Sequence, residues 1–192
     1  MSEANPVEKT HKKKKKGIDL KPTLGCIICV DVGLSEQMQS GGSIRMKPQE
    51  NQALKSFEQQ NLFGKGSENK AYAAFFTGNS YLNPLTQPTC GLSLANVTFE
   101  PGCRNHWHIH HASSGGGQLL ICTAGEGWYQ EAGKPAVSLR PGMVVTIPAN
   151  VKHWHGAQKN SWFAHIAVEI PGENSRTEWC EPVPDDAYDA LD

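Results

Sequence analysis

The pattern of hydrophobic and polar positions changes near residue 90. Beyond that point, short runs of β-prone residues alternate with turn signals such as Pro101-Gly102 and Pro141-Gly142. Turn signals at a spacing of roughly 8–12 residues are typical of an antiparallel β-sandwich or barrel. We therefore predict an all-β domain with strands over 92–100, 118–124, 128–131, 137–139, 143–147 and 162–170.

The chain before residue 90 lacks this alternation of strand-like runs and turns. Residues 1–48 are rich in Lys, Gly, Ser and Gln, which do not build a buried core. We divide the protein into an N-terminal extension, residues 1–58, and a β domain, residues 59–188. Four further elements are predicted: a short strand at 24–30, a helix over 48–60, a polar link at 64–69 and a helical turn over 185–191.

The composition suits one folded domain with an appendage. The 192 residues are 38% hydrophobic and 19% charged, so a buried core can form. No apolar stretch approaches the ~18 residues that a transmembrane helix needs. The net charge of −1 argues against a bulk binder of nucleic acid. We expect neither a nucleic acid nor a membrane as a partner.

Positive charge is concentrated at the N-terminus. Residues 1–21 hold seven of the 18 basic residues, including the run Lys12–Lys16, so the remainder of the chain is acidic. We interpret residues 1–21 as a basic, largely disordered tail, because no aromatic or amphipathic pattern accompanies the lysines. A nuclear signal, a nucleic-acid arm and a patch for anionic membranes are the alternative interpretations.

The sequence favours an intracellular protein without a disulfide scaffold. Asp19, Lys21 and Pro22 interrupt the segment that follows the lysines, so we expect a cytoplasmic location, with a degenerate secretory signal as the open alternative. Six cysteines are too sparse for a disulfide scaffold. Cys26 and Cys29 have redox or half-zinc spacing, but no second pair lies at zinc-ribbon distance.

The histidines are the strongest candidates for chemistry, because seven of the eight lie between positions 106 and 165. Side chains alternate faces along a strand, so His106, His108 and His110 share one face. His153 and His155 share a face of a second strand by the same reasoning. Neutral imidazole is a common ligand of first-row divalent metals, so these pairs predict a metal site if their strands line one interior.

The spacing around the first group resembles that of the cupins, jelly-roll or double-stranded β-helix proteins with two sequence motifs. The first motif runs Gly, five residues, His-x-His, three or four residues, Glu, six residues, Gly. Gly102 is followed by five residues and then by His108 and His110, and Gln118 is followed by six residues and Gly125. The chain departs from this motif in two ways. Seven residues, instead of three or four, lie between His110 and Gln118, which suits a bulged loop, and Gln118 takes the place of the motif Glu.

The second cupin motif runs Gly, five residues, Pro-x-Gly, two residues, His. Gly142 leads to Pro148-Ala149-Asn150 and then to His153. Asn150 replaces the motif Gly, a mild change because Asn also tolerates the left-handed backbone region. The resemblance implies an all-β cupin jelly-roll barrel with an N-terminal extension and a metal site whose ligands are His108, His110, Gln118 and His153.

The chain is most similar in its motifs to small, single-domain bacterial cupins associated with carboxymuconolactone-decarboxylase-type proteins. Some members of that group are manganese-dependent hydroxynitrile lyases. The resemblance implies a divalent transition metal, with Mn favoured over Fe, Ni, Co or Zn. It further implies His165 as the catalytic acid/base. Glu169 shares a strand face with His165 and is expected to orient or tune it, and His155 shares a face with His153. We therefore place His155, Glu169 and Trp154 beside the ligands or along the pocket.

These residues imply a metal-dependent, lyase-like enzyme that acts on a small carbonyl- or carboxylate-bearing molecule. An amide ligand cancels none of the metal charge, so a divalent ion keeps its full +2 and is a stronger Lewis acid. The resemblance also implies a homodimer. The alternatives are an Fe(II)-dependent dioxygenase and a non-catalytic, metal-stapled cupin that binds a small ligand or acts as an accessory subunit.

Overall fold

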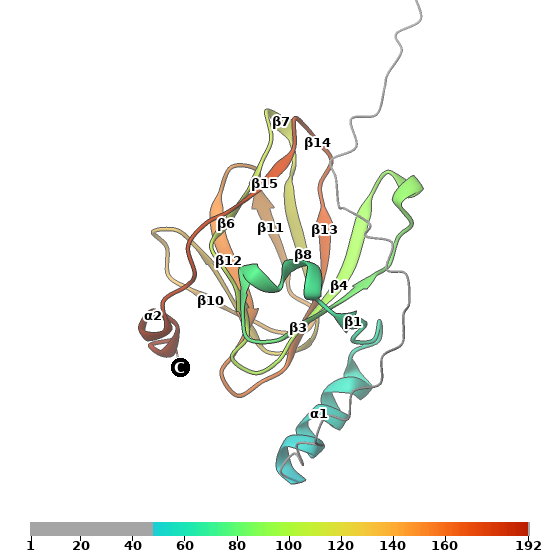
Figure 1. Cartoon of the computed structure of the whole chain (residues 1–192), viewed down its shortest axis with the longest axis vertical. Helices are drawn as coiled ribbons and strands as arrows, with labels where there is room; N and C mark the ends of the chain where they lie inside the picture. The colour runs from blue at the N-terminus through green and yellow to red at the C-terminus, as the bar shows by residue number, and fades with distance from the viewer. Residues whose placement is uncertain (1–47, 192) are drawn as a thin grey trace, which may run out of the picture. The chain divides into compact units, whose positions relative to one another are not determined.

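The structure of the protein is a computed structural model in which residues 48–191 are described (Figure 1). The basic tail, the strand predicted at 24–30 and Cys26 with Cys29 lie outside the described residues. The helices are α1 (Pro48–Gln60), η1 (Lys70–Phe75), η2 (Pro88–Cys90) and α2 (Asp185–Asp189). The strands are β1 (Ser67–Glu68), β2 (Phe76–Thr77), β3 (Ser80–Pro84), β4 (Ser93–Phe99), β5 (Arg104–Asn105), β6 (His108–His111), β7 (Ser114–Gly115), β8 (Gly117–Gly125), β9 (Gly127–Glu131), β10 (Val137–Leu139), β11 (Val144–Pro148), β12 (Lys152–Ala157), β13 (Phe163–Glu169), β14 (Gly172–Glu173) and β15 (Arg176–Trp179).

The strands form two antiparallel sheets and a small ribbon. The six-stranded sheet has the order β1-β3-β4-β13-β8-β11. The seven-stranded sheet contains the path β10-β9-β12-β5-β2, with β6 paired to both β12 and β15. The ribbon pairs β14 with β7. The described part of the chain is therefore an all-β jelly-roll barrel, which confirms the predicted fold class.

The core lies between the two sheets and follows the period-2 pattern of the sequence. Along β8, buried positions alternate with half-buried ones, because successive side chains point to opposite faces. Leu120 and Cys122 of β8 point into the core beside Phe163 of β13. The other buried members of this cluster are Val97, Phe99, Cys103, Tyr129, Leu139, Ile147 and Ala157.

The helix predicted over 48–60 is confirmed as α1, which packs on the barrel rather than standing apart from it. Phe57 is 5% exposed, and its ring stacks on Trp162 with centroids 5.5 Å apart. Just past the helix, Asn61 Nδ2 donates to Thr98 Oγ1 at 3.3 Å and Asn61 Oδ1 accepts from Asn96 Nδ2 at 3.0 Å. The last turn of the predicted extension is thus anchored on the outer face of the six-stranded sheet.

Two predicted connections contain more pairing than their polar composition indicated. The link at 64–69 is wrong as a simple loop, because Ser67 and Glu68 pair with the edge of β3. The glycine-rich loop between His110 and Gln118 contains β7, which pairs with β14. In both places a partner strand satisfies the backbone hydrogen-bonding groups of a short segment. Strand propensity reflects local composition, so it does not predict pairing of this kind.

Three motif positions adopt the backbone that the motifs require. Gly125 has φ +67°, and a Cβ there would clash with the carbonyl oxygen of Trp162. Gly142, the first residue of the second motif, has φ +89°. Asn150 has φ 68°, so this residue adopts the left-handed conformation in place of the motif glycine, as predicted.

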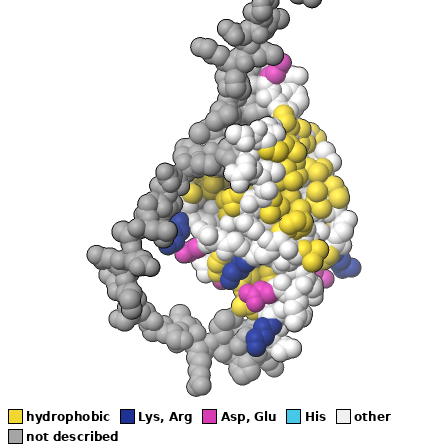
Figure 2. Space-filling view, turned by 90° about the vertical axis from the view of Figure 1, so that its right-hand side faces the viewer, with side chains coloured by type: hydrophobic (Ala, Val, Ile, Leu, Met, Phe, Trp, Pro, Cys, Tyr) yellow, Lys and Arg dark blue, Asp and Glu magenta, His cyan; other side chains and the backbone are white. Residues whose placement is uncertain are grey.

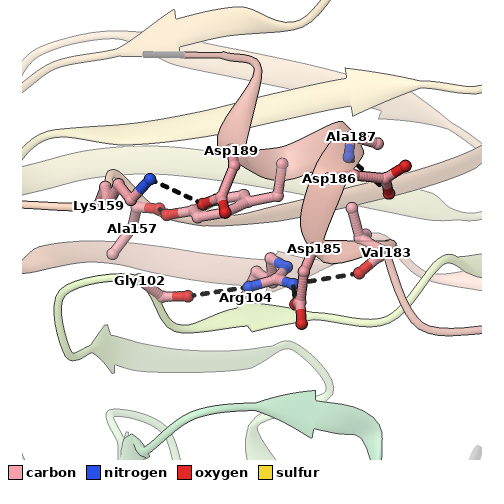
Figure 3. A network of polar contacts seen from close by, with 10 residues as sticks. Gly102, Arg104, Ala157, Lys159, Val183, Asp185, Asp186, Ala187 and Asp189 are labelled. Carbon is pink, nitrogen blue, oxygen red and sulfur yellow. Dashed lines mark hydrogen bonds and ion pairs between the residues drawn. The ribbon is translucent and has the colours of Figure 1, made fainter.

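The C-terminal segment returns to the barrel and ends in α2, which confirms the predicted turn over 185–191 (Figure 3). The Arg104 guanidinium is buried, pairs with Asp185 and donates to the Val183 carbonyl at 3.2 Å. It also lies 4.2 Å from the ring centroid of Tyr188, whose hydroxyl donates to the Ala157 carbonyl at 2.7 Å.

Among residues 48–191, no helix has the length and apolar character needed to cross a membrane.

The four cysteines in this range are all free thiols, namely Cys90, Cys103, Cys122 and Cys180. Cys103 and Cys122 are buried, and burial raises the pKa of Cys122 to about 11, so this thiol stays protonated at neutral pH.

Candidate metal centre

Two neighbouring strands of the seven-stranded sheet bring the first histidines together. In the antiparallel pairing of β6 with β12, His108 lies directly opposite His153. Their ring centroids are 4.1 Å apart, and the His110 ring lies 5.1 Å from His108 and 5.5 Å from His153. All three side chains are buried, with exposed fractions of 7% or less. The predicted sharing of one face by His108 and His110 is thus confirmed.

The six-stranded sheet supplies polar residues from the opposite wall of the barrel. Gln118 is 5% exposed and lies on the inward face of β8, two residues before Leu120 of the core. The longer connection of seven residues between His110 and Gln118 therefore leaves Gln118 in register. Glu169 of β13 is paired directly with Gln118, and His165 lies four residues earlier on the same face.

Backbone carbonyls fix the tautomer of two histidines. His108 Nδ1 lies 2.9 Å from the His106 carbonyl oxygen, and His153 Nδ1 lies 2.9 Å from the Val151 carbonyl oxygen. A carbonyl oxygen only accepts, so in each ring Nδ1 carries the proton and donates. Each Nε2 is left with a lone pair, which is the form in which imidazole binds a metal.

For the other two predicted ligands, His110 and Gln118, the hydrogen-bond acceptor is the carboxylate of Glu169 instead of a backbone carbonyl. His110 Nδ1 lies 3.2 Å from Glu169 Oε2 and 3.3 Å from the Thr177 hydroxyl. Gln118 Nε2 donates to Glu169 Oε1 at 2.8 Å. Burial favours the neutral acid, but the hydrogen bonds from His110 and Gln118 outweigh it and lower the pKa of Glu169.

The donor atoms on the inward side of these residues have no partner. Among the described residues, His110 Nε2, His153 Nε2 and Gln118 Oε1 are buried side-chain atoms without a hydrogen bond. A buried polar atom without a partner costs about 1–3 kcal/mol, a cost that a bound ion would offset at this place. Two buried rings whose centroids lie 5.5 Å apart and one buried amide oxygen offer lone pairs of the kind that suit a cation.

His155 adds a further imidazole to the cluster. His108, His153 and His155 each offer a ring nitrogen, and these atoms lie within 4.8 Å of one another. The nitrogens of His155 are however engaged. Nδ1 lies 3.2 Å from His165 Nε2, and Nε2 lies 3.1 Å from Asn105 Nδ2. His155 thus connects the cluster to His165 deeper in the barrel.

Burial keeps these imidazoles neutral at pH 7. Burial lowers the pKa of His165 to about 4, partly opposed by a hydrogen bond with the backbone of Ile166. It also lowers the pKa of His153 to about 4. The pKa values of His108 and His155 lie well below the ordinary range, because burial dominates and neighbouring imidazoles add to it. Neutral rings are the forms that bind metals and accept protons.

One residue of the predicted set, Trp154, lies away from this cluster, as do the two histidines outside that set, His106 and His111. Trp154 points to the opposite face of β12, where it packs with Val183 and Tyr188, so the structure does not bring it to the pocket. The physical reason is strand alternation, which turns it away from His153 and His155. His106 lies before the start of β6 and is half-buried, and His111 is paired at the surface with Glu178.

The cluster has an aromatic contact and a polar contact that no sequence motif predicts. The Trp179 ring lies 4.9 Å from His108 and stacks on Phe75 of η1 at 4.7 Å. Asn105 contacts His155 through its side chain. No motif marks Trp179, and its strand β15 is a four-residue segment that reaches His108 only through pairing with β6.

The fold and the cluster together define a β-barrel protein with a candidate metal site between its sheets. The sequence matches the cupin domain family over residues 95–166. An (R)-mandelonitrile lyase from Granulicella tundricola is 39% identical over 127 residues, which span 65% of this chain and 94% of that protein. A solved cupin-like protein from Thermotoga maritima is 40% identical, covers 67% of this chain and 95% of its own, and superimposes with a TM-score of 0.58. The chain belongs to the cupin family.

Proposed function

We propose that the protein binds one divalent metal ion through His108, His110, Gln118 and His153. The observation that carries this proposal is a set of three buried atoms, His110 Nε2, His153 Nε2 and Gln118 Oε1, that have no hydrogen-bond partner among the described residues. The outward nitrogen of each of these side chains is held by a hydrogen bond or ion pair. This arrangement leaves only lone pairs on the inside.

Mn²⁺ is the ion that we favour. Imidazole nitrogens and an amide oxygen, without a thiolate, suit an octahedral first-row ion. Four protein ligands on such an ion leave about two positions for a substrate, which is a feature of catalytic metal sites. When bound, the ion supplies Lewis-acid polarisation of a carbonyl, hydroxyl or carboxylate oxygen at these positions.

We further propose a lyase-like reaction on a small carbonyl- or carboxylate-bearing molecule. The relative named an (R)-mandelonitrile lyase suggests an α-hydroxynitrile as the first substrate to test. In that cleavage the hydroxyl proton passes to a base, the carbon–nitrile bond breaks, and the released cyanide takes up a proton, so that an aldehyde and hydrogen cyanide form. His165 is the proposed base, in contact with His155 at 3.2 Å. Its low pKa keeps it neutral and able to accept a proton.

Metal analysis of the purified protein tests the site. We expect about one divalent ion per chain in the wild type, and loss of that ion in His108→Ala. His111→Ala is the matched control, because His111 lies on the same strand and pairs with Glu178 at the surface. Full metal content in His108→Ala would contradict the site. Retention in Gln118→Ala would remove Gln118 from the ligands and leave the three histidines.

Turnover tests the reaction separately. We expect metal-loaded wild type to release hydrogen cyanide from mandelonitrile, and His165→Gln to keep the metal while turnover falls about 10²–10⁴-fold, the range for a general acid/base. Oxygen consumption in place of cyanide release would instead assign the site to dioxygenation. A metal-loaded protein that binds a ligand without any turnover would be the non-catalytic form of a cupin.

A further inference from the structure

Glu169 contacts two of the four proposed ligands, and it uses a different oxygen for each. Oε1 accepts a hydrogen bond from Gln118 Nε2 at 2.8 Å, and Oε2 lies 3.2 Å from His110 Nδ1. The pairing of β13 with β8 places Glu169 directly opposite Gln118. His110 belongs to β6 in the other sheet. One carboxylate therefore connects ligands that come from the two walls of the barrel.

The contact with Glu169 determines which end of the Gln118 amide faces the interior. An amide has a donor end and an acceptor end, and only its oxygen can bind a cation. An ionised carboxylate is only an acceptor, so it selects the orientation in which Nε2 faces Glu169. Oε1 then points inward, where it is buried and has no partner among the described residues.

The same carboxylate determines the tautomer of His110. His108 and His153 have backbone carbonyls on Nδ1, whereas His110 has Glu169 and the Thr177 hydroxyl. A hydroxyl both donates and accepts, so Thr177 is compatible with either tautomer. Glu169 only accepts, so it is the group that requires the proton on Nδ1 and leaves the lone pair on the inward Nε2.

We propose that Glu169 is the positioning residue of the metal site, which sets the amide orientation of Gln118 and the tautomer of His110 and thereby makes both side chains competent ligands. This inference rests on the proposed metal site. The carboxylate also places one negative charge beside a ligand set that carries none. Gln118 lacks the carboxylate of the motif Glu, and the carboxylate of Glu169 lies directly opposite it on the neighbouring strand β13.

The single substitution Glu169→Gln should leave a hydrogen-bonding mismatch with one of the two ligands, and metal affinity measures its effect. The new amide can accept from only one of the two ligands and presents its NH₂ group to the other. Either Gln118 or His110 must then turn its donor inward. We expect Mn²⁺ affinity, measured by competition with a chelator, to fall about 10–100-fold, as is typical when a hydrogen-bond partner of a ligand is lost.

An exchange variant that combines Gln118→Glu with Glu169→Gln removes this conflict. The carboxylate introduced at position 118 would accept from the amide nitrogen introduced at position 169 and offer its second oxygen to the metal. The oxygen of the introduced amide would accept from His110. We expect the exchange variant to regain most of the affinity that Glu169→Gln loses. A role in packing alone predicts the opposite, because the exchange alters both positions and would then be at least as harmful as the single change.

Glu178→Gln is the matched control, since Glu178 also pairs with a histidine, His111 at 2.8 Å, but contacts none of the proposed ligands. Its Mn²⁺ affinity should equal that of the wild type. The side chain of Glu169 is 39% exposed, so its replacement removes little core packing, and thermal unfolding of the metal-free variants checks this. Nitrogen-15 NMR of metal-free wild type reads the His110 tautomer without any substitution, and we expect the proton on Nδ1.

The outcomes separate this inference from the proposed function. Absence of stoichiometric Mn²⁺ binding by the wild type would contradict the metal site itself. Normal binding by the wild type, its loss in His108→Ala and unchanged affinity in Glu169→Gln would leave the site intact and overturn the role of Glu169. A proton on Nε2 of His110, or an exchange variant as weak as Glu169→Gln, would also overturn it.

Discussion

At the scale of single residues, the interior of the barrel stabilises neutral imidazole. His108, His153, His155 and His165 are each at most 4% exposed, and burial is the largest cause that lowers the pKa of every one of them. In the unfolded chain the same rings have their ordinary pKa of about 6.5. Folding therefore releases protons whenever the pH lies between the two values.

This difference predicts how stability depends on pH in the metal-free protein. His153 and His165 have folded pKa values of about 4, so the unfolded state binds more protons between about pH 4 and 6.5. Stability is fully present above pH 6.5 and is lost as the pH falls through this window, by up to about 1.4 kcal/mol per pH unit for each ring. Thermal unfolding in steps from pH 7 to pH 4 measures the effect.

His165→Gln serves as the comparison for the pH series. It removes one of the buried rings, so its loss of stability between pH 6.5 and 4.5 should be shallower than that of the wild type. Equal slopes for the two proteins, or a wild-type midpoint that does not change over this range, would contradict the prediction.

At the scale of elements, the C-terminal segment is held on the barrel by one aromatic residue and one guanidinium. Tyr188 of α2 is 4% exposed, packs edge-on against Trp154 and lies beneath Arg104. The segment before α2 carries β15, which pairs with β6 and brings Trp179 onto His108. Anchoring of the last turn thus supports the strand beside the candidate metal centre.

Tyr188 offers a graded test of this anchor. We expect Tyr188→Ala to lower the free energy of unfolding by about 3–5 kcal/mol, because it removes a buried ring. Tyr188→Phe keeps the ring and loses only the hydrogen bond to the Ala157 carbonyl, so its cost should be about 1 kcal/mol. Denaturant unfolding measures both variants, and equal costs would show that ring burial is not what holds the segment.

At the scale of the whole molecule, the outer face of the six-stranded sheet is partly open. Figure 2 shows hydrophobic side chains gathered over much of the described surface that faces the viewer, with few charged groups among them. One end of this sheet is covered by α1 through Phe57 and Trp162. Near the other end, Val144 of β11 is 58% exposed and lies beside the half-buried Ile121. Among the described strands, β11 pairs only with β8.

An exposed edge strand next to an apolar sheet face favours self-association, so we propose a homodimer through β11. Light scattering after size exclusion should give about twice the chain mass of 21.0 kDa. Val144→Lys should shift the protein toward a monomer. Val137→Lys, at a 46% exposed valine on β10 of the other sheet, is the matched control. A monomeric wild type, or the same shift in both variants, would rule out this interface.

Most of the barrel was predictable because its signals are local. The run 118–124 and the turn glycine Gly125 mark β8, and the pattern over 48–60 marks α1. The strand at 67–68 and the strand β15 were not predictable. Both are short, and β15 lies beside His108 only because β6 offers it an edge. Pairing of that kind depends on distant segments, which a local pattern does not contain.

The sequence by itself determined the cupin motifs, the strand alternation and the types of donor at the candidate site, because these depend on spacing and on side-chain chemistry. Only the tertiary structure decided which donors converge. Cross-strand register sets His153 opposite His108 and Glu169 opposite Gln118. In the folded protein both ring nitrogens of His155 have hydrogen-bond partners, whereas His110 Nε2 has none among the described residues. These outcomes depend on strand pairing within each sheet and on contacts between distant segments, which local spacing along the chain does not specify.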